Sequence, residues 1–272
     1  VLKYTYLGNW EKRESNSNVE EEYLSVYLAR RGYTDKEIRS AIAKLKQAAG
    51  SLGGGLYNAN KEVYTLLRYG VNVQAEVTEK KKMVHLIDWA NPMENDFQIA
   101  EEVTIHGTSD RRPDLVVYVN GIALAVIELK RSTVSAHEGI RQNIRNQQDG
   151  YIPRFFTTIQ LLFAGNDTEG LHYGVIKTPE KFWLRWKEPC GEPCAKPHFT
   201  AEEYPNELDR SVLQFLEPAR LLEYIHDFII FDGGVKKAAR PNQYFAIKAA
   251  QPRVRNKQNG IIWHSQGSGK SL

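Results

Sequence analysis

Apolar side chains recur at helical spacing over the first seventy residues. One predicted helix contains Leu24 and Leu28 after an acidic start, and a second opens with Thr34 and runs through Leu45. A third helix is predicted over 60–69, where the apolar positions share one face. The pattern therefore predicts that the chain begins with helices.

After residue 70 the period of the pattern changes from helix to strand. Three strand candidates precede residue 106, and the segments 114–119 and 122–130 are almost continuously apolar, as in strands buried on both faces. Asn120-Gly121 between them is a strong signal for a tight hairpin turn. The middle of the chain is therefore predicted to hold a buried sheet.

Helices and strands continue to alternate toward the C-terminus. The further predicted elements are a helix over 136–148, strands over 158–164 and 172–176, a helix over 213–231 interrupted at Pro218, and a strand over 260–263. Residues 182–205 are rich in proline and are predicted to be irregular. The alternation predicts an α/β protein.

Composition narrows the possible functions only a little. The 272 residues include 36 basic and 33 acidic side chains, and the net charge of +3 is too small to predict nucleic-acid binding by itself. Hydrophobic residues make up 42%, which excludes wholesale disorder. Two cysteines cannot form a secreted disulfide framework, and no apolar run approaches the roughly 18 residues of a membrane span. We therefore expect a cytoplasmic protein without a membrane segment.

Three ionisable side chains mark the ends of the two buried strands. Asp114 opens the first strand, and Glu128 and Lys130 close the second. A hairpin at 120–121 would bring these ends together. Two carboxylates beside a lysine suit metal-dependent phosphodiester hydrolysis, with Mg²⁺ on the carboxylates and the ammonium near the attacking water. The simpler interpretation is a pair of solvated strand ends.

The alternation of side chains along the two strands of the hairpin adds a condition to this hypothesis. In a regular two-residue turn Asp114 pairs with Ile127 and points away from Glu128. The acidic side chains converge only if a longer loop or a β-bulge shifts the register by one residue. We therefore predict such an offset near Asn120-Gly121.

Several short motifs occur together around these residues. They are Arg-Arg-Pro-Asp at 111–114, Asn-Gly-Ile-Ala-Leu at 120–124, Glu-Leu-Lys-Arg at 128–131 and, upstream, Leu-Ile-Asp-Trp at 86–89. Over about residues 56–180 the chain resembles the nuclease core of type I restriction endonuclease motor subunits. The resemblance implies a PD-(D/E)xK restriction-endonuclease-like core, in which a central mixed sheet is flanked by helices.

The resemblance also implies roles for single residues. Asp114 and Glu128 would bind the metal ion, and Lys130 would complete catalysis. A glutamate on a preceding helix often contributes a further metal ligand in such nucleases. Glu62 is the candidate for it, with Glu102 on a preceding strand as the alternative.

A glutamine–tyrosine motif lies on the helix after the lysine in this family. Gln142 fits the glutamine by its distance from the lysine and joins the predicted catalytic set, although the fourth position after it is Asn146. Gln147 and Tyr151 satisfy the spacing in a later register. Before the aspartate, Arg111 and Arg112 are predicted to contact DNA phosphates.

A glycine-rich loop follows the predicted strand at 260–263. The segment 264–271 matches a phosphate-binding loop except at its first position, where His264 replaces glycine. A chance Gly-Ser-rich loop is the alternative. The predicted nucleotide-binding residues of the loop are Gly267, Ser268, Gly269, Lys270 and Ser271.

This loop resembles motif I of superfamily-two helicase motors. The segment 240–247 resembles their adenine-recognition motif, with Gln243 as the residue that reads the base. The chain would then contain only the start of a RecA-like helicase lobe. We expect it to be a piece of a longer protein that binds ATP, and not to hydrolyse ATP productively by itself.

Three parts are therefore predicted: a helical lead-in over 1–55, an endonuclease domain over 56–235 and the truncated start of a helicase-like ATPase over 236–272. The resemblance implies a Mg²⁺-dependent endonuclease that cleaves double-stranded DNA after ATP-driven translocation by the full-length protein. Methyltransferase and specificity subunits would be its partners. The alternatives are the nuclease of another helicase–nuclease fusion, in repair or phage defence, and a catalytically degenerate DNA-binding or docking module.

Overall fold

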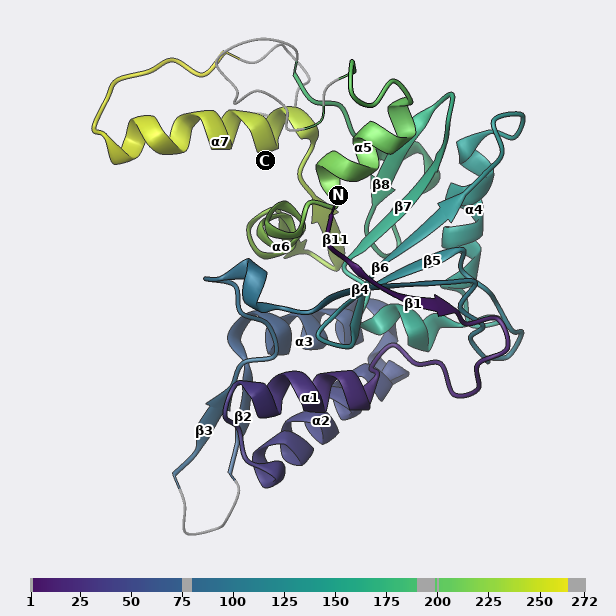
Figure 1. Ribbon diagram of the computed structural model, residues 1–272, viewed down its shortest axis with the longest axis vertical. Coiled ribbons are helices and arrows are strands. Elements are labelled where there is room, and N and C mark those ends of the chain that lie inside the picture. The colour runs from purple at the N-terminus through teal and green to yellow at the C-terminus, as the bar shows by residue number, and fades with distance from the viewer. Residues whose placement is uncertain (1, 75–79, 190–198, 200, 264–272) are drawn as a thin grey trace.

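A mixed sheet of seven strands forms the centre of the computed structural model, which describes residues 2–74, 80–189, 199 and 201–263 (Figure 1). β1 is parallel to β4 and β6 is parallel to β7, whereas the other neighbouring strands are antiparallel. The strands follow the order β1 (Thr5–Asn9), β4 (Phe97–Glu101), β5 (Leu115–Val119), β6 (Ile122–Leu129), β7 (Leu161–Asn166), β8 (Gly170–Gly174) and β9 (Leu184–Arg185).

Helices cover both faces of this sheet. The α-helices are α1 (Glu21–Arg30), α2 (Asp35–Gly50), α3 (Gly55–Tyr69), α4 (Ala136–Asn146), α5 (Glu207–Phe215), α6 (Pro218–Asp227) and α7 (Pro241–Arg255). Short 3₁₀ turns are η1 (Leu52–Gly54), η2 (Pro92–Glu94), η3 (Pro153–Thr157) and η4 (Glu180–Phe182). α4 lies on one face of the sheet, and α5 and α6 lie on the other (Figure 1). The predicted arrangement of a sheet between helices is therefore confirmed.

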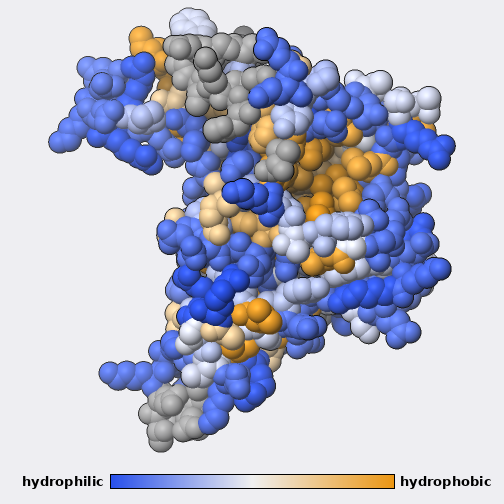
Figure 2. Space-filling model, in the orientation of Figure 1, coloured by the Kyte–Doolittle hydropathy of each residue, from blue (hydrophilic) through white to orange (hydrophobic). Residues whose placement is uncertain are grey.

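Two apolar clusters hold these layers together. One lies between α4 and the sheet and includes Ile140 and Val126, and the other packs α1, α2, α5 and α6 on the opposite face and includes Leu24, Leu45 and Phe215. In the space-filling view the outside is largely hydrophilic, and the apolar colour gathers over β6 to β8 (Figure 2). α4 is also the crossover that the parallel neighbours β6 and β7 require.

Two hairpins stand outside the main sheet. They are β2 (Val71–Val73) with β3 (Lys82–Val84), and β10 (Ile229–Asp232) with β11 (Val235–Ala238). The second hairpin corrects the helix predicted to continue to residue 231, because α6 ends at Asp227. Gly233 and Gly234 both have positive φ, the conformation of a tight hairpin turn.

The N-terminal segment shares its core with the sheet. β1, which the sequence pattern did not predict, pairs with β4 at the edge of the sheet, and Leu24 and Leu45 are fully buried. The predicted division after residue 55 therefore coincides with no break in the core. The division before residue 236 falls inside β11.

The C-terminal part of the described chain contains one helix and no strand after β11. Residues 260–263, predicted as a strand, are coil, and Ile261 and Trp263 are each 90% exposed. The strand prediction is wrong because the described chain supplies no neighbouring strand on which this apolar run could pair. No helix within the described ranges is long and apolar enough to cross a bilayer.

Candidate active site

A β-bulge in the β5–β6 hairpin brings Asp114 opposite Glu128. The turn itself is tight, since Val119 pairs with Ile122, and Asn120 and Gly121 have φ of 53° and 78°. The register then shifts by one residue between Val117 and Tyr118, so that Leu115 pairs with Ile127. The predicted offset is therefore confirmed, and it takes the form of a bulge.

Leu124 is the additional residue of this bulge. Val117 pairs with Ala125 and Tyr118 pairs with Ala123, which leaves Leu124 without a cross-strand partner. Its carbonyl oxygen instead accepts a hydrogen bond from the amide of Gln160, over 2.7 Å, so the bulge leaves this carbonyl satisfied.

Glu128 is completely buried and its carboxylate has no hydrogen-bond donor. Its exposed fraction is 0%, and neither Oε1 nor Oε2 has a partner. Burial raises the pKa of Glu128 well above its ordinary range; the negative charge of Asp114 raises it further, and the positive charge of Lys130 lowers it. Because a buried charge without hydrogen bonds is costly, this carboxylate is suited to bind a cation.

Asp114 and Lys130 complete the cluster. Oδ2 of Asp114 accepts a hydrogen bond from the amide of Leu129, over 2.7 Å, which fixes the carboxylate beside the end of β6. Nζ of Lys130 lies 3.8 Å from Oδ2 of Asp114 and 3.8 Å from Oε2 of Glu128. The structure thus brings the predicted acidic pair and the lysine into one place.

α4 supplies the fourth predicted member, Gln142. Its Oε1 accepts a hydrogen bond from Nζ of Lys130, over 2.9 Å. The helix approaches β6 closely at Gly139, where an added Cβ would lie 3.2 Å from the carbonyl oxygen of Glu128 and 3.3 Å from its Cβ. A side chain at this position would therefore require α4 or β6 to shift by a few tenths of an ångström.

The later register of the glutamine–tyrosine motif has other contacts. Gln147 is buried, donates to the carbonyl oxygen of Asn143 over 2.8 Å and accepts from the amide of Lys177 over 2.7 Å. Tyr151 stacks under the guanidinium of Arg111, whose carbon is 4.0 Å from the ring centre. Neither residue contacts Lys130, so the geometry favours Gln142 for the position next to the lysine.

Glu62 is not part of the cluster. It is exposed on α3, and the neighbouring Asn60 of that helix binds the carbonyl oxygens of residues 156, 157 and 159, at the opposite end of β6 from Glu128. Glu102 lies nearer to Glu128. Its negative charge also raises the pKa of Glu128, although burial and the charge of Asp114 have larger effects. The sequence-based choice of Glu62 over Glu102 is therefore not supported by the geometry.

The two predicted DNA-contacting arginines differ in their surroundings. Arg112 is half-exposed, and its guanidinium forms ion pairs with Glu11 and with Glu102, the latter over 2.7 Å. Arg111 is partly buried, stacks on Tyr151, and has an Nε without a partner. Both lie beside Asp114 in sequence, and the Arg112 guanidinium is the more accessible of the two.

The donor set fits a hard divalent cation. Asp114 and Glu128 offer carboxylate oxygens, the ligands that Mg²⁺ prefers, and both oxygens of Glu128 lack a proton donor. Within the described residues no group of three or more His, Cys, Asp or Glu side chains is arranged around a common point for a metal. Two carboxylates would therefore provide the side-chain ligands in this geometry.

Most of the predicted nucleotide-binding residues lie outside the described residues. These are Gly267, Ser268, Gly269, Lys270 and Ser271. Gln243 is described: it lies in the first turn of α7, and its Oε1 accepts from the amide of Arg240 over 2.8 Å. In this structure the glutamine therefore helps to cap a helix.

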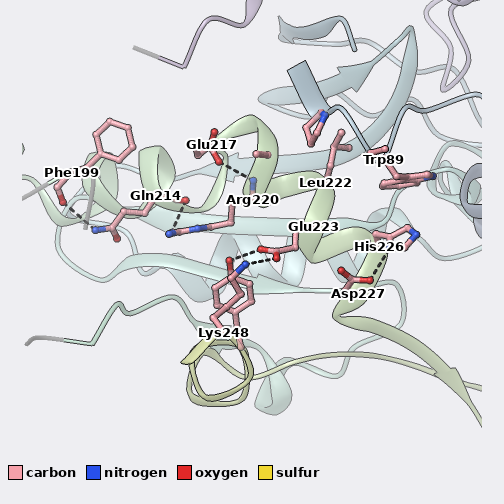
Figure 3. Close-up of a pocket in the computed structure, with 14 residues that line it drawn as sticks. Trp89, Phe199, Gln214, Glu217, Arg220, Leu222, Glu223, His226, Asp227 and Lys248 are labelled. Atoms are coloured by element: carbon pink, nitrogen blue, oxygen red, sulfur yellow. Dashed lines mark hydrogen bonds and ion pairs between the residues drawn. The ribbon is translucent and has the colours of Figure 1, made fainter. Parts of the chain in front are cut away.

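A cavity of about 1100 Å³ lies beside α6 and α7, and no residue of the acidic cluster lines it (Figure 3). Its charged side chains are paired with one another or with nearby groups: Glu223 binds Lys248, Asp227 binds His226, and Arg220 binds Glu188. Because these charges are already satisfied, the cavity presents no chemistry that competes with the Asp114–Glu128 site.

Known protein families match two segments of this chain. A family model described as the type I restriction enzyme R protein N terminus matches residues 1–181, and one described as SWI2/SNF2 ATPase matches residues 242–272. The chain is 28% identical over 259 residues to the putative type I restriction enzyme MjaVIIIP endonuclease subunit of Methanocaldococcus jannaschii, covering 88% of this chain and 23% of that protein.

A bacterial relative gives a similar result. The chain is 26% identical over 246 residues to the type I restriction enzyme SsaAORF53P endonuclease subunit of Staphylococcus saprophyticus, covering 88% of this chain and 24% of that protein. The chain thus spans about a quarter of the length of these two relatives.

Proposed function

The chain belongs to the type I restriction enzyme R protein N-terminus family, and on that premise we propose that it supplies the DNA-cleaving part of such a subunit. The observation that carries the proposal is the buried carboxylate of Glu128, which has no donor of its own and faces Asp114 and Lys130. A buried carboxylate without hydrogen bonds does not stabilise the packing of the core, whereas a bound cation would compensate its charge.

We assign the sheet and its helices to the PD-(D/E)xK restriction-endonuclease-like class. Two observations support this assignment. Asp114 directly precedes β5, and the Glu-x-Lys segment lies at the end of β6. Gln142 of α4 accepts a hydrogen bond from Lys130. For residues 236–272 we propose the beginning of a RecA-like helicase lobe, because 242–272 match the SWI2/SNF2 ATPase family model. Gln243 and the loop at 267–271 would bind ATP there.

Asp114 and Glu128 would hold Mg²⁺ through carboxylate oxygens, and both oxygens of Glu128 lack a hydrogen-bond donor. Held there, the ion would supply Lewis-acid polarisation of a DNA phosphate. Hydrolysis adds a water oxygen to phosphorus and breaks one phosphate ester bond, so the site must also place a water and offset charge on the phosphate oxygens. Lys130 suits both tasks, because its ammonium lies 3.8 Å from each carboxylate and is positioned by Gln142.

The remaining parts of the proposal concern the longer protein. Double-stranded DNA is the substrate, with Arg111 and Arg112 beside the site as phosphate contacts. ATP-driven translocation by the motor would precede cutting, and methyltransferase and specificity subunits would select the target. The assembly would work in the cytoplasm. The similarity to type I restriction enzyme endonuclease subunits supports these assignments.

Soaking crystals of the 272-residue chain in Mn²⁺ tests the site directly. We expect anomalous density between the carboxylates of Asp114 and Glu128. Density only at another place would overturn the assignment of these residues.

Variants in the full assembly test the reaction. Glu128→Ala and Lys130→Ala should each abolish DNA cleavage and keep DNA binding. Unchanged cleavage by both variants would refute the site. Absence of metal binding and of cleavage in the wild-type assembly would point instead to a catalytically degenerate DNA-binding module.

A further inference from the structure

Three carboxylates lie side by side at the adjoining ends of β4, β5 and β6. Glu101 pairs with Leu115 in β4–β5, and the amide of Glu102 continues this ladder by donating to the carbonyl oxygen of Asp114, over 2.8 Å. The β5–β6 register places Asp114 opposite Glu128. Glu102, Asp114 and Glu128 therefore form a row at one end of the sheet.

Glu102 differs from its two neighbours in its backbone and its partner. Its φ is 51°, in the left-handed region that is costly for a residue with a Cβ. Its carboxylate lies 2.7 Å from Nε of Arg112, and the same guanidinium also pairs with Glu11 from the segment after β1. Arg112 thus binds Glu102 at the edge of the site, while the carboxylate of Glu128 next to it accepts no hydrogen bond and has the ammonium of Lys130 3.8 Å away.

The ion pairs of Arg112 are open to exchange. Side-chain exposures are 46% for Arg112, 38% for Glu102 and 47% for Glu11, so solvent and a DNA phosphate can reach the guanidinium. A phosphate is a strong bidentate partner for arginine, and it would compete with a carboxylate for the same N–H groups. Glu11 would keep Arg112 in place after Glu102 has left.

We propose that Arg112 withholds Glu102 from the metal site, and that a DNA phosphate bound by Arg112 releases Glu102 to become a third carboxylate ligand beside Asp114 and Glu128. This inference rests on the proposed function, since it assumes a metal ion at the Asp114–Glu128 pair. Its consequence is that the chain binds metal more tightly when DNA is present. The nuclease site would be completed only on its substrate.

Mn²⁺ binding to the 272-residue chain tests, without DNA, whether Arg112 withholds Glu102 from the metal site. The binding is measured from the electron paramagnetic resonance signal of the free ion. Arg112→Gln should raise the Mn²⁺ affinity about fivefold, the effect expected from releasing one exposed ion pair. The double variant Arg112→Gln/Glu102→Asp keeps the charge of residue 102 but shortens its reach, and it should lose this gain. Glu101→Asp, at the adjacent last residue of β4, is the matched control and should bind like the wild type.

Two results would overturn the inference. An unchanged affinity in Arg112→Gln would show that Glu102 is not withheld. A gain that persists in the double variant would show that only the lost positive charge matters. Circular dichroism melts of each variant would confirm that the affinities are measured on folded protein.

Asp114→Asn separates this inference from the proposed function. It should weaken Mn²⁺ binding by at least about tenfold, the loss expected when a ligand is removed. If Asp114→Asn binds like the wild type, the metal site itself is misassigned and the proposed function fails. If it loses binding while Arg112→Gln has no effect, only the role of Arg112 and Glu102 fails.

DNA binding gives the reciprocal measurement. By linkage, an ion that binds better on DNA must raise DNA affinity by the same factor. Fluorescence anisotropy of a short duplex oligonucleotide, with and without Ca²⁺, should therefore show a larger ion-dependent gain for the wild type than for Glu102→Asp, by about fivefold. Equal gains in the two proteins would overturn the release step.

Discussion

Lys130 donates a hydrogen bond from Nζ to Oε1 of Gln142, over 2.9 Å. The carboxylates of Asp114 and Glu128 are farther from the same ammonium, at 3.8 Å each, beyond the length of a normal hydrogen bond. α4 therefore positions the lysine through Gln142, and the acidic pair holds it only by longer-range attraction. Both oxygens of Glu128 are left without a hydrogen-bond donor.

Removing this contact should impair cleavage and leave the fold intact. In Gln142→Leu the ammonium of Lys130 loses its hydrogen-bond partner. We expect cleavage by the full assembly to fall about tenfold to a hundredfold, as when a residue that orients a metal ligand or catalytic group is removed. DNA binding and the melting temperature should stay close to those of the wild type. Gln148→Leu, on the exposed surface just beyond α4, is the matched control. Wild-type cleavage rates in Gln142→Leu would remove the residue from the site.

Glu128→Gln should stabilise the metal-free chain at neutral pH. The folded pKa of Glu128 is raised above its unfolded value of about 4.3, so its contribution to stability is complete at acidic pH and is lost as the pH rises through the folded pKa. The variant carries no charge to bury and should gain about 1 to 3 kcal/mol in unfolding free energy near pH 8. Urea unfolding in EDTA at several pH values measures this difference, which should grow with pH. A variant less stable than the wild type at pH 8 would contradict the buried charge.

Metal affinity should rise with pH for the same reason. A metal ligand must be deprotonated, and below the raised pKa of Glu128 each bound cation displaces a proton. The dissociation constant for Mn²⁺ should therefore fall by up to about tenfold per pH unit in that range and level off above it. Calorimetric titrations of the wild type and of Glu128→Gln distinguish this effect, because the variant should bind weakly with little dependence on pH.

The most precise prediction from the sequence concerned the register of the β5–β6 hairpin. Side chains alternate between the two faces of a strand, so Asp114 and Glu128 could meet only if the strand register shifted by one residue. Asn120-Gly121 indicated the position of the turn. Such local rules apply because the turn and both strands are continuous in the chain. Which residue forms the bulge did not follow, since Leu124 is selected by the amide of Gln160, far away in sequence.

Long-range packing explains what the sequence pattern missed. β1 is five residues long and partly exposed at the sheet edge, so it carries no strand periodicity of its own. Glu62 was chosen as a metal ligand from its place on a helix, but the orientation of α3 depends on contacts with residues near 160. Glu102 lies near the site because of the pairing of β4 with β5, which no local motif specifies.

Lys236 is a second consequence of long-range packing. It is 3% exposed, and its Nζ donates to Oδ1 of Asn60 over 2.8 Å and to Oε1 of Gln160 over 2.6 Å. These acceptors are neutral, and burial holds the pKa of Lys236 well below its ordinary range. Because Gln160 also binds the carbonyl oxygen of Leu124, Lys236 joins the β10–β11 hairpin to the bulge that sets the register of the candidate active site.

Lys236→Met should therefore destabilise the chain, and its effect should depend on pH. Loss of the amine leaves the side-chain oxygens of Asn60 and Gln160 without this donor, which should lower the unfolding free energy by about 1 to 3 kcal/mol. Between the lowered folded pKa and the unfolded value of about 10.4, the unfolded wild type binds more protons than the folded one, so raising the pH stabilises the wild type. The difference from Lys236→Met should accordingly widen between pH 8 and about pH 10 in urea unfolding. Lys237→Met removes the neighbouring lysine, which pairs with the exposed Asp232, and should show neither the loss nor the pH dependence. Parallel pH curves for the wild type and Lys236→Met would mean that the buried amine is not charged differently in the folded and unfolded states.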